Sequence, residues 1–432
     1  MRRPSPLPAQ PPSASCDSRR LLAARGVRAF GDGFVSLLLP AYLLELGWTP
    51  LQVGLVATTT LLGSGLLTLA AGLLGQRLGH RRLLLGATGL MVATGLGVAS
   101  FSSFWPLMLV AFVGTLNPSG GDTSVFLPAE HALLAQGAEG RARTAAFARY
   151  SLVGSLSAAA GALAAALPGL LSAQGGLATR TSLQAMFLLY AVLGLLVAVL
   201  YRGLGTRAAQ APEDGRSSGL GPSRRRVYLL AGLFSLDAFG GGFVVQSLLA
   251  LWLYQRFGLS LEAAASIFFW TGVLTAFSYL VAARIADRIG LVRTMVYTHL
   301  PSSLCLIAMP FCTELAWAIG LLLVRSALSQ MDVPTRSSYV MAIVTPAERS
   351  AAAGVTSVPR SLAASASPAL AGYLLGLSAF GWPLVIGGAL KIVYDLLLLA
   401  MFSRVHPPEE GEKKSGPRAA SSGSSGSPPS RG

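Results

Sequence analysis

Long apolar stretches follow one another along most of the chain, and they limit its fold more than any other feature. Only 12% of the residues are charged, whereas an ordinary soluble domain carries about 25%. A helix that crosses the hydrocarbon core of a bilayer needs about 20 apolar residues, and the stretches reach that length. Strands of a membrane barrel would alternate in polarity over about ten residues, but 61–74 and 191–200 do not alternate. The sequence therefore predicts an all-α polytopic membrane protein.

The spacing of these stretches predicts about twelve transmembrane helices in two pseudo-symmetric six-helix halves. We expect helices at 27–46, 51–75, 83–103, 105–136, 145–172, 182–202, 227–255, 261–283, 292–312, 315–343, 350–376 and 380–403. The predicted organisation is a disordered cytoplasmic tail at 1–24, an N-terminal half at 25–203, a cytoplasmic linker at 204–226, a C-terminal half at 227–403 and a second disordered cytoplasmic tail at 404–432. Both tails are rich in Pro, Ser and charge, a composition that buries too little apolar surface to fold.

The net charge of +15 is distributed in a way that predicts topology rather than nucleic-acid binding. Most of the 33 Lys and Arg lie in the two tails and in alternate loops that would share one face of the membrane, while Arg180 and Arg256 would lie on the other face. Lys and Arg accumulate in cytoplasmic loops. We therefore expect both termini in the cytoplasm and a multi-pass protein of the cell (plasma) membrane, with the lipid bilayer as a partner and no nucleic acid.

Cysteine usage gives no support for redox or metal chemistry. Cys16, Cys305 and Cys312 make neither a paired framework nor a metal-binding cluster. Glycine-rich matches lie in helical stretches, without the strand and loop that a phosphate-binding site requires. We expect no metal, no cofactor and no enzymatic activity.

The two halves of the chain repeat one another. A shift of 211 residues superposes GLLGQRLGHRR at 72–82 on ARIADRIGLVR at 283–293. A shift of 206 residues superposes Pro128 on Pro334. Parallel repeats of this kind commonly place the substrate path between the halves, near the bilayer midplane.

The repeated segment at 72–82 resembles the loop between helices two and three of the major facilitator superfamily. That pattern runs roughly Gly-x-x-x-Asp-Arg-x-Gly, followed by basic residues. The copy at 283–293 supplies the Asp-Arg-x-Gly core from Asp287 onward, whereas the first copy has Gln76 in place of the acid. The resemblance covers both halves and implies the twelve-helix fold of that superfamily, with transport by alternating access.

The resemblance also implies a cytoplasmic gate at these loops. Gly allows a tight turn between helices, and Asp and Arg side chains can join helix ends in one state and release them in another. We expect Asp287 to pair with Arg336, and Arg77 or Arg81 to pair with Glu130, which the 206-residue shift aligns with Arg336. The predicted gate residues are Arg77, Gly79, Arg81, Glu130, Asp287, Arg288, Gly290, Arg293 and Arg336.

Several ionisable residues fall within apolar segments, where a charge is costly unless it faces the interior of the bundle. Asp237, Arg325 and Arg360 each lie eleven residues beyond a charged residue at the expected membrane surface, a depth of about 16 Å in a helix. A polar stripe on the helix at 315–343 is formed by Arg325, Ser329, Asp332 and Arg336.

Two acids of the N-terminal half are further candidates. The segment NPSGG at 117–121 should loosen the fourth helix directly before Asp122, and broken helices commonly hold ions or substrates. Asp32 stands four residues after Arg28, which favours a local pair, and its spacing to Pro40 is similar to an acid-to-proline pattern in some proton-coupled drug exporters.

The resemblance and the buried charges together predict a secondary active transporter of a small organic solute, monomeric, with proton-coupled efflux as the leading hypothesis. The predicted substrate or proton path consists of Asp32, Asp122, Asp237, Arg325, Asp332 and Arg360. Two arginines near the midplane also fit a uniporter or importer of an organic anion. A non-transporting receptor or scaffold with a transporter-like fold is the alternative from another class. We assign His131 and His299 a structural role.

Overall fold

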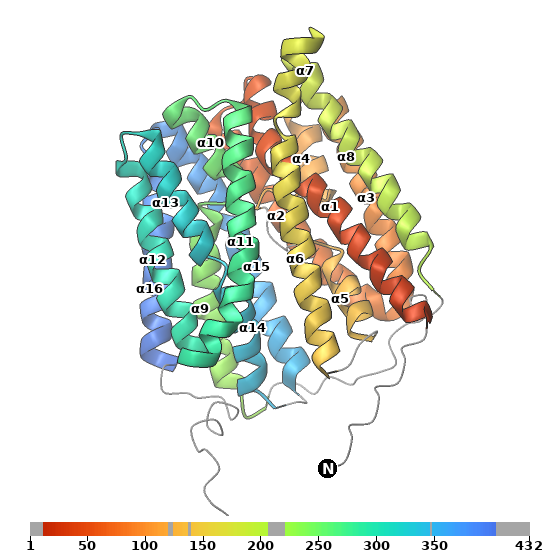
Figure 1. Ribbon diagram of the computed structural model, residues 1–432, viewed down its shortest axis with the longest axis vertical. Helices are drawn as coiled ribbons and strands as arrows, with labels where there is room; N and C mark the ends of the chain where they lie inside the picture. The colour runs from red at the N-terminus through yellow and green to blue at the C-terminus, as the bar shows by residue number, and fades with distance from the viewer. Residues whose placement is uncertain (1–11, 120–123, 137–139, 206–220, 346–347, 403–432) are drawn as a thin grey trace, which may run out of the picture.

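The computed structural model describes residues 12–119, 124–136, 140–205, 221–345 and 348–402, and every regular element within these ranges is a helix (Figure 1). The N-terminal half contains α1 (Pro12–Glu45), α2 (Pro50–Leu78), α3 (His80–Ser100), α4 (Phe104–Val113), α5 (Leu127–Gln136), α6 (Gly140–Ala164), α7 (Leu167–Gly175) and α8 (Thr179–Arg202). The C-terminal half contains α9 (Arg224–Gly242), α10 (Gln246–Phe257), α11 (Leu261–Ile289), α12 (Leu291–Ala308), the 3₁₀ helix η2 (Met309–Phe311), α13 (Leu315–Leu328), α14 (Asp332–Ile343), α15 (Arg349–Leu377) and α16 (Trp382–Phe402).

These helices confirm the predicted fold class. Each of the twelve expected spans coincides with one helix or with two consecutive helices. Within the described residues, eight helical segments are long and apolar enough to cross a membrane unaided. Among the others, α4 and α13 are shorter apolar helices, and each is followed along the chain by the second part of its span, α5 and α14.

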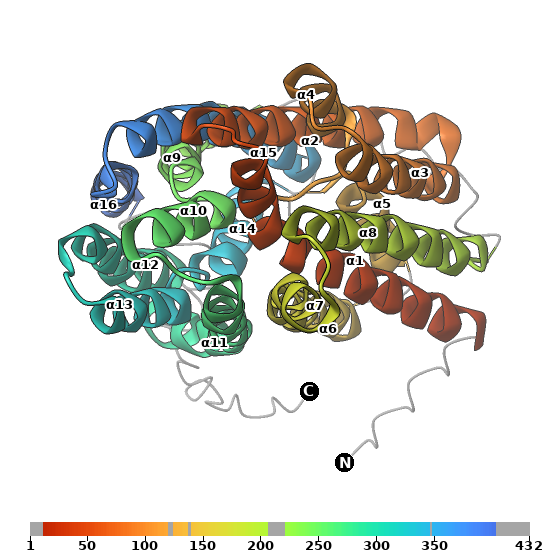
Figure 2. The same cartoon turned by 90° about the horizontal axis from the view of Figure 1, so that it is seen from above.

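Two bundles stand side by side, α1 to α8 in one and α9 to α16 in the other (Figure 2). Across the interface between the bundles, α2 packs against α15 and α6 packs against α11. The bundle interiors are apolar, with large side chains such as Tyr42, Phe187 and Trp252 almost completely enclosed. Polar side chains at membrane depth face the interior of a bundle, where they contact other protein groups and not lipid.

Two equivalent spans are interrupted in mid-membrane. Between α4 and α5 the described residues form no helix, as the NPSGG segment predicts, and α13 is separated from α14 by 329–331. The second interruption differs from the prediction, which places a single helix over 315–343. Pro128 and Pro334, which the 206-residue shift superposes, each lie in the first turn of the segment that follows the break. Proline lacks an N–H and is tolerated in the first turn but not inside a helix, so it fixes where the new segment starts.

The start of α1 corrects the predicted boundary of the N-terminal tail. Residues 12–24, expected to be disordered, are the first turns of this helix, and Leu21 and Ala24 are buried. The carboxylate of Asp17 accepts a hydrogen bond from the backbone N–H of Gly205, and Arg20 donates one to the carbonyl of Gly203. These contacts hold the helix start against the end of α8, which a reading of composition alone misses. The predicted tail at 404–432 lies outside the described residues.

The two halves touch on the side opposite to the chain termini. Gly354 and Gly372 are 18 residues apart on α15, five turns of helix, and therefore share one face. Gly372 packs against Gly54 of α2, and a Cβ added to Gly54 would lie 2.5 Å from the carbonyl oxygen of Pro368. Among the described residues, no atom lies within 4 Å of a Cβ added to Gly354, and Gly354 and Ser357 are exposed. The same face of α15 is thus covered by α2 at Gly372 and exposed at Gly354.

Candidate functional site

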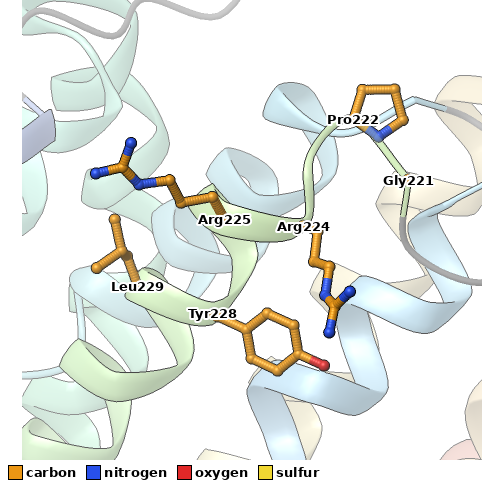
Figure 3. A pocket seen from close by; sticks show the side chains of 6 residues that line it. All are labelled: Gly221, Pro222, Arg224, Arg225, Tyr228 and Leu229. Atoms are coloured by element: carbon orange, nitrogen blue, oxygen red, sulfur yellow. The ribbon is translucent and has the colours of Figure 1, made fainter.

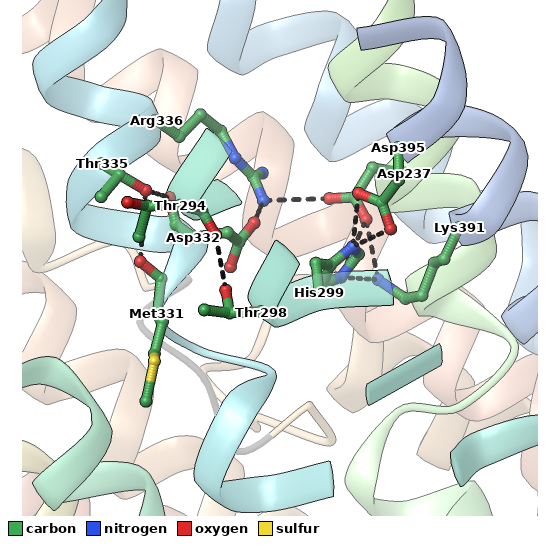
Figure 4. A network of polar contacts seen from close by, with 10 residues as sticks. All are labelled: Asp237, Thr294, Thr298, His299, Met331, Asp332, Thr335, Arg336, Lys391 and Asp395. Atoms are coloured by element: carbon green, nitrogen blue, oxygen red, sulfur yellow. Dashed lines mark hydrogen bonds and ion pairs between the residues drawn. The ribbon is translucent and has the colours of Figure 1, made fainter. Parts of the chain in front are cut away.

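Asp237 of α9 is the centre of a buried network of ionisable side chains in the C-terminal half (Figure 4). Its Oδ1 lies 2.8 Å from Lys391 Nζ of α16, and its Oδ2 lies 3.1 Å from Arg336 Nη2 of α14. His299 Nε2 of α12 is 3.7 Å from Asp237 Oδ1 and 3.4 Å from Lys391 Nζ. One carboxylate thus gathers cationic or protonatable groups from three other helices.

The same histidine joins a second acid to the network. His299 Nδ1 lies 3.0 Å from both carboxylate oxygens of Asp395, which is fully enclosed on α16. Lys391 and Asp395 are four residues apart and therefore lie on one face of that helix. An ionised carboxylate in such a place requires a compensating charge, and the histidine ring is its direct neighbour.

The broken span supplies the remaining members. Asp332 is the first residue of α14, and Arg336, one turn later, forms ion pairs with both Asp332 and Asp237. The break at 329–331 therefore places a carboxylate at a helix N-terminus, where the helix dipole favours negative charge. Of the predicted polar stripe, the structure brings Asp332 and Arg336 into the network.

Two predicted path residues lie elsewhere. Arg325 of α13 is beside Cys305 of α12 and has no carboxylate partner among the described residues. Arg360 of α15 is exposed, and Arg336 and Asp237 are its charged neighbours. Arg360 also has no ion-pair partner in the part of the chain that the structure describes. The first arginine is thus apart from the network, and the second lies at its edge.

A second buried ionic cluster occupies the N-terminal half. Arg28 of α1 pairs with Glu130 of α5, and both side chains are almost completely enclosed. The hydroxyl groups of Tyr150 on α6 and Tyr201 on α8 also donate to the Glu130 carboxylate. Four helices of this half therefore meet at one carboxylate, as they do at Asp237 in the other half.

The expected local ion pair of Asp32 with Arg28 is not formed, because Arg28 pairs with Glu130. The buried Asp32 carboxylate instead accepts hydrogen bonds from the Tyr190 hydroxyl, at 3.5 Å, and from Asn117 in the α4–α5 break. Asp122, the acid predicted beyond that break, lies outside the described residues.

The predicted gate loops contain the expected glycine turns. Gly79 and Gly290 adopt φ angles of 76° and 88°, a region that residues with a Cβ rarely enter. Arg288 and Arg293 are exposed. The side chain of Arg77 lies outside the described part of the chain.

The predicted gate pairings are corrected where the structure describes both partners. Glu130 is paired with Arg28, not with Arg81, whose Nη2 donates to the carbonyl of Arg202 at 2.7 Å. Arg336 is paired with carboxylates of α9 and α14, while the side chain of its expected partner, Asp287, is not among those described.

A pocket of about 590 Å³ lies apart from the network, at the start of α9 (Figure 3). Its lining residues are Gly221, Pro222, Arg224, Arg225, Tyr228 and Leu229. Beside it, the Glu348 carboxylate accepts hydrogen bonds from the Gly221 N–H at 2.6 Å and the Ser223 hydroxyl at 2.8 Å. This pocket is on the surface and contains no residue of the ionic network. No group of three or more His, Cys, Asp or Glu among the described residues is arranged to hold a metal ion.

Three members of the network were not predicted as site residues: His299, Lys391 and Asp395. For the histidine, the sequence predicts a structural role, because it stands alone in its segment. A signal was present in the sequence, since a Lys and an Asp four residues apart in an otherwise apolar helix mark a polar face at membrane depth. Their partner could be identified only once α12 and α16 were seen packed together.

Comparisons with known proteins agree with this architecture. The profile of the Major Facilitator Superfamily matches residues 21–330 and 236–428. An uncharacterized membrane protein of Saccharomyces cerevisiae is 27% identical over 426 residues, covering 90% of this chain and 94% of that protein. The multidrug efflux protein YfmO of Bacillus subtilis is 26% identical over 377 residues, covering 85% of this chain and 89% of that protein.

Solved transporter structures share the fold. A mutant of the nucleoside transporter NupG superposes with a TM-score of 0.69 at 12% identity, covering 89% of this chain and all of that one. The human organic anion transporter MFSD10 superposes with a TM-score of 0.63 at 18% identity, covering 90% of this chain and all of that one. With the profile match over nearly the whole chain, the conclusion is that this protein belongs to the Major Facilitator Superfamily and is a multi-pass membrane transporter, not an enzyme.

Proposed function

We propose that the protein is a proton-coupled secondary transporter that exports a small organic solute by alternating access. The observation that carries this proposal is the buried network around Asp237, which joins ionisable groups of α9, α12, α14 and α16. Export is supported by the similarity to the multidrug efflux protein YfmO. The positive-inside distribution of Lys and Arg supports cytoplasmic termini, and we propose a monomer in the plasma membrane.

The physical reason for proton coupling is charge compensation in a medium of low dielectric constant. Buried carboxylates stay ionised only while cations remain close, and separating such a pair is strongly unfavourable. Asp237 is held by Lys391 and Arg336, whereas Asp395 has His299 as its hydrogen-bond partner. A movement of one helix relative to the others would leave a carboxylate uncompensated, and uptake of a proton removes that charge. Asp32, hydrogen-bonded to Tyr190 beside the α4–α5 break, is our second candidate for proton transfer, and Asp122 remains a candidate of the path.

The gate residues predicted from the repeated loops remain part of the proposal. Gly354, in the first turns of α15, is exposed, which supports a cytoplasmic side that can open. Closing this side would bring the loops after α2 and α11 towards the opposite half. We propose that the glycine turns at Gly79 and Gly290 act as pivots and that their basic residues contact helix ends in the closed state. Asp287 remains our candidate to engage Arg336 in that state.

A second candidate function is supported by Arg360 and Arg325. Neither guanidinium has a carboxylate partner among the described residues, and an unpaired arginine is well suited to a carboxylate or phosphate of a ligand. A uniporter or importer of an organic anion would use them without a proton. Dependence on a pH gradient separates this function from the first.

The test is transport by the purified protein in proteoliposomes, with and without a pH gradient, using anionic, neutral and cationic solutes. We expect solute movement driven by the gradient, and its loss in Asp237→Asn. Glu314→Gln is the matched control, because Glu314 is an exposed acid at the start of α13. Equal rates with and without the gradient would favour the uniporter. If no solute moves above an empty-vesicle control, the transport proposal fails and the scaffold alternative stands.

A further inference from the structure

We propose that Arg336, Arg360 and Tyr394 form a binding site for an oxyanion of the transported solute, a carboxylate or a phosphate, at the edge of the Asp237 network. The three side chains come from α14, α15 and α16. This inference rests on the proposed transport function and specifies the chemical class of its substrate.

Arg336 brings unused donors to this place. Its Nη2 makes both ion pairs, with Asp237 and with Asp332. Its Nε and Nη1 are buried and have no acceptor in the described part of the protein. A buried donor without an acceptor is costly, so this guanidinium gains from an added acceptor.

Tyr394 adds a second donor of the same kind. Its side chain is completely enclosed on α16, one residue before Asp395, and its hydroxyl has no hydrogen-bond partner among the described residues. Its ring lies 6.4 Å from the ring of Phe234, centroid to centroid, and the Arg336 guanidinium lies over the same Phe234 ring at 5.2 Å. The other charged neighbours of Tyr394 are Asp237, Asp395 and Arg360. Buried tyrosine hydroxyls usually find a partner, and the described side chains offer none here.

Arg360 supplies the exposed side of the site. On α15, Arg360, Ala364 and Ser367 are spaced by four and three residues and so lie on one face. Ser367 donates to the carbonyl of Phe239 on α9, at 2.6 Å. The face that carries Arg360 is therefore the face turned towards α9, yet the Arg360 side chain is exposed. The guanidinium is therefore accessible from outside the protein on the side of α15 that faces α9, and Arg336 and Asp237 are its charged neighbours.

The charges around the site favour an anion. Asp237 and Asp332 are engaged by Arg336, and Lys391 also holds Asp237. Asp395 faces His299. The cation at Arg360 is left without a described carboxylate, so the positive charge available to a ligand is at this edge. An oxyanion there would accept from two guanidinium groups and one phenol, and guanidinium groups bind carboxylate and phosphate oxygens in pairs.

Ligand-induced thermal stabilisation of the full-length protein in detergent tests the site. The probes are a matched series on one organic scaffold: a carboxylate, a phosphate monoester, the neutral amide and a quaternary amine. A ligand that binds the folded state raises the melting temperature with concentration. We expect stabilisation by the anionic members only, and the stronger of the two identifies the oxyanion.

Variants connect the binding to these residues. Arg360→Gln should weaken the binding of the anion about tenfold or more, with partial recovery in Arg360→Lys, and Tyr394→Phe should weaken it less. Arg256→Gln, an exposed arginine at the end of α10, should bind as the unaltered protein does. Melting temperatures without ligand show whether each variant is folded, and the lysine variant provides the comparison if the glutamine variant is not.

The inference is overturned if the amide or the amine stabilises the protein as well as the anions do, if no anion stabilises it, or if Arg360→Gln keeps full affinity. These outcomes are separable from those of the transport assay. Proton-driven movement of a neutral or cationic solute would uphold the proposed function and refute the anion site. Anion binding lost in Arg360→Gln, without movement in vesicles, would uphold the site and refute the function.

Discussion

Glu130 and Arg336 occupy equivalent positions in the two halves and carry opposite charges. Glu130 on α5 pairs with Arg28 on α1, and Arg336 on α14 pairs with Asp237 on α9. In the N-terminal half α1 is thus joined to α5, and in the C-terminal half α9 is joined to α14, with the acidic and basic partners exchanged. Both halves therefore contain an ion pair between the corresponding spans, but the acid is on the later span in the first half and on the earlier span in the second half.

Breaking the N-terminal pair should destabilise the protein strongly. Arg28→Met leaves the enclosed Glu130 carboxylate without its cation, and removing one partner of a buried pair costs about 3–5 kcal/mol. Arg28→Met combined with Glu130→Gln should cost much less than the sum of the two single changes. Chemical denaturation of the four proteins in detergent measures this cycle, and additive losses would show that the two residues do not interact.

The phenol of Tyr201 should contribute separately to the same cluster. Tyr201→Phe removes a donor to Glu130 Oε1 without changing the ring, so we expect a loss of about 1–3 kcal/mol from an acceptor left short of a partner. Tyr228→Phe is the matched control, because the Tyr228 side chain is exposed on α9. Equal melting temperatures for the two variants would contradict the role of the hydroxyl.

Gly54 should control the closed side of the molecule. A valine there would place its Cβ 2.5 Å from the Pro368 carbonyl oxygen, and the halves would have to part. We expect Gly54→Val to increase labelling by an impermeant maleimide of a cysteine placed at the buried interface position Ser36, in a background without native cysteines. Gly89→Val is the control, because no atom of the described residues lies within 4 Å of a Cβ there. Equal labelling in both variants would refute the contact.

Glu348 should make the stability of the loop region depend on acid pH. Hydrogen bonds from the side chains of Ser223 and Thr345 lower the pKa of Glu348 from 4.5 to about 2. Because the folded-state pKa is the lower one, the ionised carboxylate stabilises the fold above pH 4.5, and this contribution disappears as the pH falls towards 2.

Glu348→Gln should therefore melt at a lower temperature than the unaltered protein at pH 7. The difference should shrink between pH 4.5 and 2, as followed by scanning fluorimetry. Glu45→Gln changes an exposed acid at the end of α1 and should show no such trend. A difference that stays constant with pH would rule out the carboxylate as its cause.

The positions of the spans could be predicted because the cost of exposing polar backbone to lipid leaves a strong trace in the sequence. The break between α13 and α14 gives a weaker signal in the sequence. Pro334 follows Val333 and precedes Thr335, and whether a proline bends a helix or starts a new one depends on contacts that composition does not record. The start of α1 was missed for a similar reason, since its helix depends on contacts with the end of α8.

The ionic site was predicted in part. Asp237, Asp332 and Arg336 could be identified because a charge at membrane depth demands an explanation. Their partners could not, because the pairing depends on which faces of distant helices meet. His299 became a member through the packing of α12 against α16, and Arg325 did not because its own contacts are with α12 near Cys305.

The break in α4–α5 has one further consequence. The backbone N–H of Ser247, in the first turn of α10, donates to the carbonyl of Pro118 at 3.0 Å, so a main-chain amide of one half is satisfied by the main chain of the other. Any movement that separates the halves at this point has to break this bond. The Ser247 N–H would then need another acceptor, because a buried amide without one is costly.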